Sequence, residues 1–117
     1  MKISYYKCNG NGNTFIIITH NNSIDKKFFN PRKIKKLCYL DRQNITDGLI
    51  IINIKENLLF MDYYNNDGLW ETFCLNGLRC ASLLIYNKFN KKDINIICNK
   101  IVFKTLVIND NSIQVQL

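Results

Sequence analysis

Short apolar runs separated by polar turns make up most of the chain. Each run is strand-sized, rich in Ile, Leu, Phe or Tyr, and bounded by Asn, Asp, Gly or Lys residues, as strands and their turns are. The turn at Asp47-Gly48 leads into one such run, and the turn at 55–57 leads back into the next, which predicts a hairpin. The predicted strands are 3–7, 15–19, 49–54, 58–64, 94–98, 101–108 and 112–117.

Two segments have a helical pattern instead. In the first, Asn30 is a good cap and Pro31 fits the first helical position, so a helix is expected from there to near Leu40. In the second, Asn76 is the expected cap, and an apolar face predicts a helix buried against the sheet. The apolar positions are 34, 37 and 38 in the first helix and 78, 81, 84 and 85 in the second.

The order of these elements is β-β-α-β-β-α-β-β-β. The chain has no internal repeat and no Pro- or Ser-rich linker, so residues 1–117 are expected to form a single domain. The physical interpretation is an α+β fold with a curved, mostly antiparallel sheet wrapped around a buried central helix.

The formal charge of +7 changes this picture little. Thirteen of the 16 basic residues are Lys, and Asn and Ile occur 18 times each, so A- and T-rich codons account for the composition. The lysines are scattered, and no nucleic-acid partner is expected. No apolar run approaches the roughly 18 residues that a membrane span needs. With no signal-peptide pattern either, the expectation is a soluble, cytoplasmic protein without a membrane partner.

The five cysteines do not have the spacing of a disulfide framework or a zinc site. Their number is odd, no Cys-x-x-Cys occurs, and His20 is the only histidine. No metal is therefore expected. Cys38 and Cys98 lie in apolar patterns and are predicted to be core thiols.

The stretch Phe-Cys-Leu-Asn-Gly-Leu-Arg-Cys at 73–80 is the candidate reactive segment. Cys74 comes just before the second predicted helix, whose first N–H groups lack intrahelical partners and carry partial positive charge. A thiol there ionises more easily, and a carboxylate can bind beside it. Such a turn could hold an amino acid by its α-carboxylate while a thiolate removes the α-proton. From spacing alone, a structural cysteine remains the alternative, and Cys80 is predicted to pack in the core.

The loop Gly10-Asn11-Gly12-Asn13 offers a second, weaker signal. Its glycines could present backbone N–H groups to an anion, but the same residues also make ordinary tight turns. It does not match a phosphate-binding fingerprint, because a strand follows it instead of a helix.

Three motifs occur in a fixed order along the chain. Residues 7–15 read Lys-Cys-Asn-Gly-Asn-Gly-Asn-Thr-Phe, and 47–50 read Asp-Gly-Leu-Ile. Residues 65–70 read Asn-Asn-Asp-Gly-Leu-Trp, and Cys-Leu-Asn-Gly-Leu-Arg-Cys follows at 74–80. In order and spacing the chain resembles the N-terminal half of diaminopimelate epimerase. In that family the corresponding motifs are Lys-x-x-Gly-x-Gly-Asn-Asp-Phe and an Asp-Gly-Leu-like turn. The third is Asn-x-Asp-Gly-Ser-Glu, followed by Cys-Gly-Asn-Gly-x-Arg-Cys.

The resemblance implies an isomerase that interconverts LL- and meso-diaminopimelate in lysine biosynthesis. Members of the family use two cysteines on opposite faces of the α-carbon and no metal, pyridoxal phosphate or other cofactor. By motif, Cys74 would be the first of these cysteines, and Asn13 and Asn65 would bind the amino-acid substrate. The backbone at Leu75 and Asn76 would hold the α-carboxylate.

The chain departs from the family pattern at several positions. Leu75 replaces a Gly and would be strained if the backbone there had a positive φ. Leu69 and Trp70 replace Ser-Glu, which removes a carboxylate from beside the loop, and Thr14 replaces an Asp.

The largest departure is that the second half of the family fold, with its second cysteine, is absent from this chain. Three hypotheses follow: a separately encoded C-terminal half completes the site, two copies pair as a homodimer, or the chain is a degenerate, non-catalytic binding domain.

Overall fold

The computed structural model describes residues 4–10, 12–21, 29–71, 74–109 and 112–116. Ile3, Asn11, Phe73 and Leu117, which fall in predicted strands or motifs, lie outside the described residues. The strands are β1 (Ser4–Gly10), β2 (Asn13–Asn21), β3 (Gly48–Lys55), β4 (Leu58–Asn65), β5 (Trp70–Glu71), β6 (Asp93–Cys98), β7 (Ile101–Asn109) and β8 (Ser112–Gln116). The helices are α1 (Pro31–Cys38) and α2 (Leu75–Phe89).

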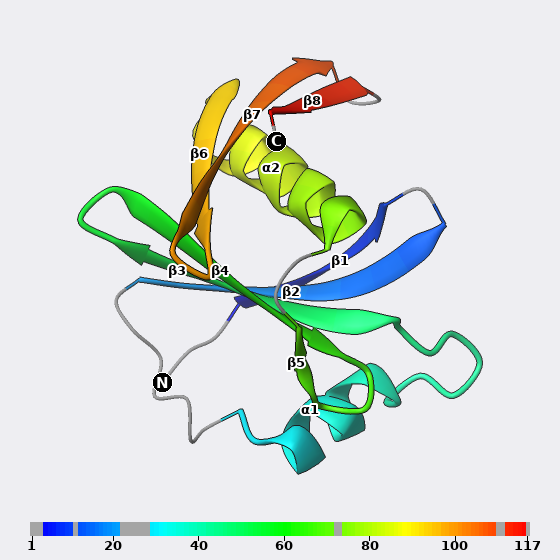
Figure 1. The fold of residues 1–117 in the computed structure, drawn as a ribbon. Helices are drawn as coiled ribbons and strands as arrows, with labels where there is room; N and C mark the ends of the chain where they lie inside the picture. Colours follow the sequence, from blue (N-terminus) through cyan, green and yellow to red (C-terminus); the bar gives the residue numbers. More distant parts are fainter. Residues whose placement is uncertain (1–3, 11, 22–28, 72–73, 110–111, 117) are drawn as a thin grey trace.

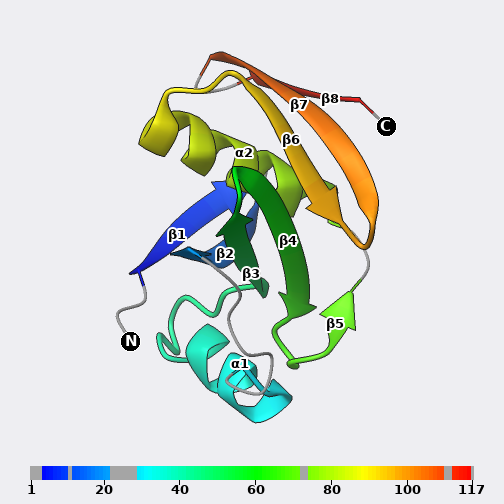
Figure 2. The same cartoon turned by 90° about the vertical axis from the view of Figure 1, so that its left-hand side faces the viewer.

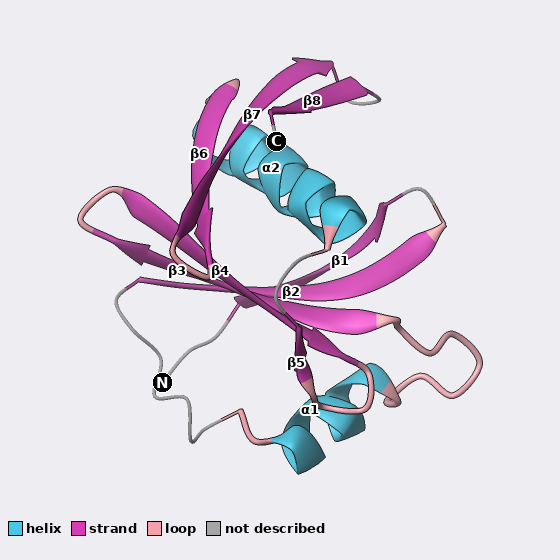
Figure 3. Ribbon diagram, viewed as in Figure 1, coloured by secondary structure: helices cyan, strands magenta, loops and turns pink. Residues whose placement is uncertain are grey.

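All eight strands belong to one sheet (Figures 1 and 3). Its order is β1-β2-β3-β4-β6-β7-β8, with β5 paired to β4. The pairs β2–β3 and β4–β6 are parallel, and the other pairs are antiparallel. The sheet curls so that α2 lies between β1–β3 on one side and β6–β8 on the other (Figures 1 and 2). The predicted α+β class, with a curved, mostly antiparallel sheet around a central helix, is confirmed.

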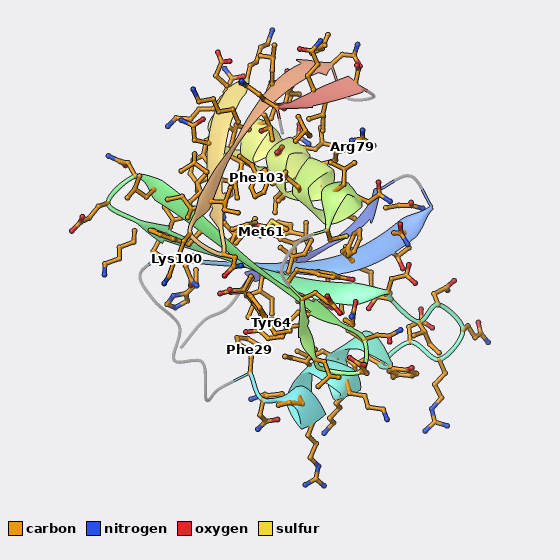
Figure 4. All side chains as sticks on the ribbon, viewed as in Figure 1. Phe29, Met61, Tyr64, Arg79, Lys100 and Phe103 are labelled. Carbon is orange, nitrogen blue, oxygen red and sulfur yellow. The ribbon has the colours of Figure 1, made fainter. Side chains whose placement is uncertain are left out.

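The central strands bury side chains on both of their faces. In β2, Phe15 and Ile17 belong to the core around α2, whereas Ile16 and Ile18 belong to a second core under α1. Alternate residues of a strand point to opposite faces, which explains why this stretch is apolar throughout instead of alternating with polar residues. Figure 4 shows Met61 and Phe103 between the sheet and α2, and Phe29 and Tyr64 toward α1.

The start of α1 agrees with the prediction from sequence. The Asn30 side chain accepts a hydrogen bond from the Lys33 amide at 2.8 Å, and Pro31 is the first helical residue. The helix ends at Cys38, two residues before the expected end near Leu40.

The predicted cap of α2 was wrong. Cys74, not Asn76, is the cap: its backbone is extended, and its sulfur accepts a hydrogen bond from the Gly77 amide at 3.4 Å. Asn76 is instead the second residue of the helix, and its side chain turns away toward β2. The two-residue strand β5 was not predicted, because a pair of residues has no periodicity to detect.

Candidate functional site

The site residues predicted from sequence gather at one end of the α2 face of the sheet. Asn13 begins β2, Asn65 ends β4, and Cys74 precedes α2. The parallel register pairs Phe15 with Gly48, and the antiparallel register pairs Gly48 with Asn65, so the ends of these strands are level. Residues that are far apart in sequence therefore lie at the same end of the sheet.

Cys74 is half-buried and combines two roles. Its carbonyl accepts the first helical hydrogen bond, from the Leu78 amide at 2.9 Å, and its sulfur accepts the Gly77 amide. Within the described residues, the amides of Leu75 and Asn76 donate to no protein acceptor. First-turn amides of this kind are available to a bound anion. The Cys74 sulfur and a potential anion site therefore lie within one helical turn.

Gly77 allows this turn to pack closely on β3. A Cβ atom at this position would lie 3.0 Å from Cδ1 of Ile50 and 3.5 Å from the Cys74 sulfur. The contact with Ile50 is tighter than most Cβ contacts, so the end of the Ile50 side chain would have to shift slightly to admit a side chain here.

Leu75 adopts helical backbone angles as the first residue of α2, and it is not among the residues with positive φ. The strain that a positive φ would have imposed on a leucine is therefore absent. The replacement of the family's glycine is accommodated by the backbone, with the leucine side chain half-buried.

Asn13 and Asn76 contact each other directly. The Asn76 side-chain amide donates to the Asn13 side-chain oxygen at 2.6 Å, which joins the start of β2 to the start of α2. In the preceding loop, the Gly12 amide donates to the Asn9 side chain at 3.1 Å, so it points into the turn. The carboxylate of Asp47 accepts from the Thr14 amide at 2.8 Å and fixes the strand that carries Asn13.

Asn65 is held by two side chains that the sequence analysis missed. The Tyr63 hydroxyl donates to the Asn65 side-chain oxygen at 2.9 Å, and the Asn65 amide donates to the Glu71 carboxylate at 2.9 Å. Together these bonds fix the orientation of the Asn65 amide. Glu71 also corrects an expectation: although Trp70 replaces the family's Glu, the next residue supplies a carboxylate beside the loop.

Tyr63 fits because Gly48 on the neighbouring strand has no side chain. A Cβ at Gly48 would lie 2.8 Å from the Tyr63 hydroxyl oxygen. Burial, followed by the negative charges of Cys74, Asp47 and Glu71, raises the pKa of Tyr63 to about 12. The phenol therefore keeps its proton at neutral pH and remains a donor to Asn65. The two-residue spacing of Tyr63 and Asn65, which places them on one face of a strand, was the available sequence signal.

Three of the other cysteines are more deeply buried than Cys74. All five are free thiols, and Cys38, Cys80 and Cys98 are buried, as predicted. Burial raises the pKa of Cys38 and brings that of Cys98 to about 11. Among the described residues, no group of three or more His, Cys, Asp or Glu side chains is arranged to hold a metal ion.

Some of the basic residues are less scattered than the sequence suggests. Those around α1 surround a wide depression of about 730 Å³, lined by Arg32, Lys35, Lys36, Tyr39, Leu40, Arg42 and Ile45. It lies on α1, away from Cys74. In the part of the chain that the structure describes, neither helix is long and apolar enough to cross a membrane.

Curated relatives match most of the chain. It is 39% identical over 115 residues to the diaminopimelate epimerase of Flavobacterium psychrophilum, covering 92% of this chain and 42% of that protein. The diaminopimelate epimerases of Aquifex aeolicus and Thermotoga maritima are 29% and 30% identical and cover 89% and 92% of this chain. The chain therefore spans only about two fifths of the length of these relatives. No protein-family profile matches it.

Solved structures share the fold at low sequence identity. A phenazine biosynthesis protein of the PhzF family from Enterococcus faecalis has a TM-score of 0.70 at 7% identity, covering 92% of this chain and 41% of that one. The corresponding Bacillus anthracis protein has a TM-score of 0.62 at 14% identity and covers 93% of this chain and 36% of that one. These similarities establish the fold only.

Proposed function

Since this chain belongs to the diaminopimelate epimerase family and matches about two fifths of its relatives' length, we propose that it forms one side of an amino-acid epimerase site. The proposed reaction interconverts LL- and meso-diaminopimelate by thiol-based proton transfer, without metal or pyridoxal phosphate. The observation that carries the proposal is the start of α2. There the Cys74 sulfur caps the helix next to two amides that have no protein acceptor among the described residues.

In this proposal the substrate's α-carboxylate binds the amides of Leu75 and Asn76. The helix dipole and these N–H groups stabilise the negative charge of the carboxylate. The Cys74 thiolate then takes the α-proton: the C–H bond breaks, an S–H bond forms, and the electron pair remains on the α-carbon. Fixed dipoles at the helix start stabilise the carbanion without a cofactor.

Asn13 and Asn65 are the proposed side-chain ligands of the substrate. Both are already oriented by partners, Asn13 by Asn76 and Asn65 by Tyr63 and Glu71. Preorientation of this kind lowers the entropic cost of binding. Tyr63 acts in this scheme as a positioning residue, because it reaches the substrate only through Asn65.

Epimerisation needs a second acid or base on the opposite face of the α-carbon. Cys74 serves one face only, so residues 1–117 are proposed to be one domain of a two-domain site. Its partner would be either a C-terminal half of the family fold or a second copy of the chain. With a second copy, a two-fold axis would bring two Cys74 side chains to the same cleft.

The proposal is tested by following loss of the α-proton signal of LL-diaminopimelate in D2O by NMR. Wild type and Cys74→Ala are compared, with Cys38→Ala as the control for loss of an unrelated thiol. The chain is assayed alone and with an added C-terminal half of a diaminopimelate epimerase. Light scattering measures self-association.

Cys74-dependent exchange by the chain alone supports pairing of two copies. Exchange only with the added half supports a split enzyme. Absence of exchange under both conditions overturns the catalytic proposal and leaves a non-catalytic binding domain.

A further inference from the structure

Asp47 lies between the two asparagines that are the proposed side-chain ligands of the substrate. It is the residue just before β3, and β3 is flanked by β2 on one side and by β4 on the other. Asn13 begins β2 and Asn65 ends β4, at the same end of the sheet. The residue that follows each asparagine, Thr14 or Asn66, is hydrogen-bonded to Asp47.

Asp47 holds Thr14 through both of the threonine's backbone groups. The Thr14 amide donates to Oδ2 of Asp47 at 2.8 Å, and the Asp47 amide donates to the Thr14 carbonyl at 2.8 Å. Both distances are those of well-formed hydrogen bonds. The first bond depends on the Asp47 side chain, whereas the second needs only its backbone. The carboxylate therefore supplies one of the two bonds that fix the start of β2 against the start of β3.

The Asn66 side of this connection is held by several contacts. The Asn66 amide donates to the Asp47 carbonyl at 3.1 Å, and the Asn66 side chain donates to the Thr46 carbonyl at 3.3 Å. Gly68 packs so closely on α1 that a Cβ atom there would lie too near the backbone of Pro31. Asp47 thus connects the start of β2 to a turn that is itself fixed by its neighbours.

We propose that Asp47 is a positioning residue, which holds Asn13 in place relative to Asn65 so that both can contact one substrate. The inference rests on the proposed function, because it concerns the binding of diaminopimelate. Asp47 acts through Thr14 and does not touch the substrate. Without the carboxylate, the start of β2 keeps only the backbone bond to Asp47, and ordering Asn13 on binding then costs additional free energy.

Two substitutions separate the acceptor role of the Asp47 side chain from its charge. Asp47→Asn keeps a side-chain oxygen for the Thr14 amide, whereas Asp47→Ala removes it. The affinity for LL-diaminopimelate, measured by calorimetric titration, should weaken by about fivefold in Asp47→Ala and by less than about twofold in Asp47→Asn. An equal loss of affinity in both variants would show that the charge matters and not the hydrogen bond, and would overturn the proposal.

Asp41→Ala is the matched control. Asp41 is also an exposed residue of the segment between α1 and β3, and its carboxylate also accepts a backbone amide, that of Gln43 at 3.1 Å. It has no bond to Thr14 or Asn66 among the hydrogen bonds of the described residues. The control should bind LL-diaminopimelate like wild type. A loss equal to that of Asp47→Ala would contradict a specific role for Asp47.

A double-mutant cycle tests whether Asp47 acts through Asn13. Asn13→Ala should weaken binding by itself. Adding Asp47→Ala to it should weaken binding no further, because the side chain to be positioned is already gone. A residue that only stabilised the fold would lower the affinity by the same factor in both backgrounds. Additive losses would therefore overturn the proposal.

A measurement without substrate separates this inference from the proposed function. The Asn13 side chain accepts the Asn76 amide at 2.6 Å, so the NMR signals of the Asn76 side-chain amide report on the position of Asn13. In Asp47→Ala these signals should move toward their positions in Asn13→Ala, and the Thr14 amide should exchange faster with solvent deuterium. Asp47→Asn should resemble wild type.

The two measurements together have distinct outcomes. If wild type does not bind LL-diaminopimelate but the signals change as expected, the proposed function fails and the positioning of Asn13 by Asp47 stands. If the Asn76 signals and the Thr14 exchange rate are the same in wild type and Asp47→Ala, the positioning role is wrong, whatever the protein binds.

Discussion

At the start of each helix, the side chain of the capping residue accepts a backbone amide, but the accepting atom differs. At α1 an Asn30 oxygen accepts the amide three residues later at 2.8 Å, and at α2 a Cys74 sulfur accepts the equivalent amide at 3.4 Å. Pro31 removes an N–H group from the first turn of α1, whereas Leu75 keeps one at α2. Among the described residues, the first start therefore leaves one first-turn amide, that of Arg32, without a protein acceptor. The second has a weaker sulfur acceptor and amides available to a ligand.

Under the proposed function, this difference would reserve the start of α2 for substrate binding and catalysis. A strong cap satisfies the first turn and stabilises the helix, by about 1 kcal/mol for Asn. A cysteine cap gives up part of that stabilisation and places a nucleophile or base where a carboxylate can bind. The following experiments exchange or perturb features of the two starts.

Cys74→Asn gives α2 the same capping residue as α1. The α-proton exchange of LL-diaminopimelate should fall by at least about a hundredfold, because an amide cannot serve as the base. Stability should not fall and should gain up to about 1 kcal/mol, since Asn is the better cap. NMR exchange in D2O and urea denaturation measure the two effects. Retained exchange would remove Cys74 from the proposed mechanism.

Asn76→Asp places a negative charge beside the free amides of α2. The fold should tolerate the change, because the Asn13 amide can turn to donate to the new carboxylate. The charge repels the substrate's α-carboxylate, and the affinity for LL-diaminopimelate should weaken by about tenfold. Calorimetric titration measures the affinity, with Asn44→Asp as a control on an exposed loop. Unchanged affinity would place the carboxylate site elsewhere.

Asn30→Cys gives α1 the cysteine cap that α2 has. The variant should lose about 1 kcal/mol of stability, because sulfur is a poorer acceptor than the amide oxygen. It should leave α-proton exchange unchanged, since Pro31 leaves that turn without the same amide pair. Urea denaturation and the exchange assay test both statements, and a fall in exchange would show that the two helix starts are coupled.

High pH should lower the stability of the folded protein through ionisation of the Tyr63 hydroxyl. Its pKa is raised to about 12 in the folded state from 10, so this side chain contributes stability that is fully present below pH 10. That contribution is lost as the pH rises through 12, because the unfolded state releases the proton first. Tyr63→Phe should therefore lose less stability than wild type between pH 10 and 12. Parallel stability–pH curves for the two proteins would contradict the assigned burial of the phenol.

Local sequence was sufficient for features that depend on neighbouring residues. Strand periodicity, the Asn30-Pro31 helix start and the apolar face of α2 each depend on contacts within a few positions, and each was predicted. The segment containing Cys74, Leu75 and Asn76 was also selected from sequence, because its motif is continuous. Assignment of the α2 cap failed even so, since both Cys74 and Asn76 could accept a first-turn amide and local spacing does not choose between them.

Tertiary structure decided which of these side chains meet. Asn76 is drawn to Asn13, 63 positions away, because β2 begins beside the first turn of α2, and this leaves the cap to Cys74. Gly48 makes room for Tyr63 only because β3 and β4 pair in one register. The sequence by itself therefore determined most of the elements and the candidate segment at 73–80, while closure of the sheet fixed the partners of each side chain, because those contacts join residues with no local relationship.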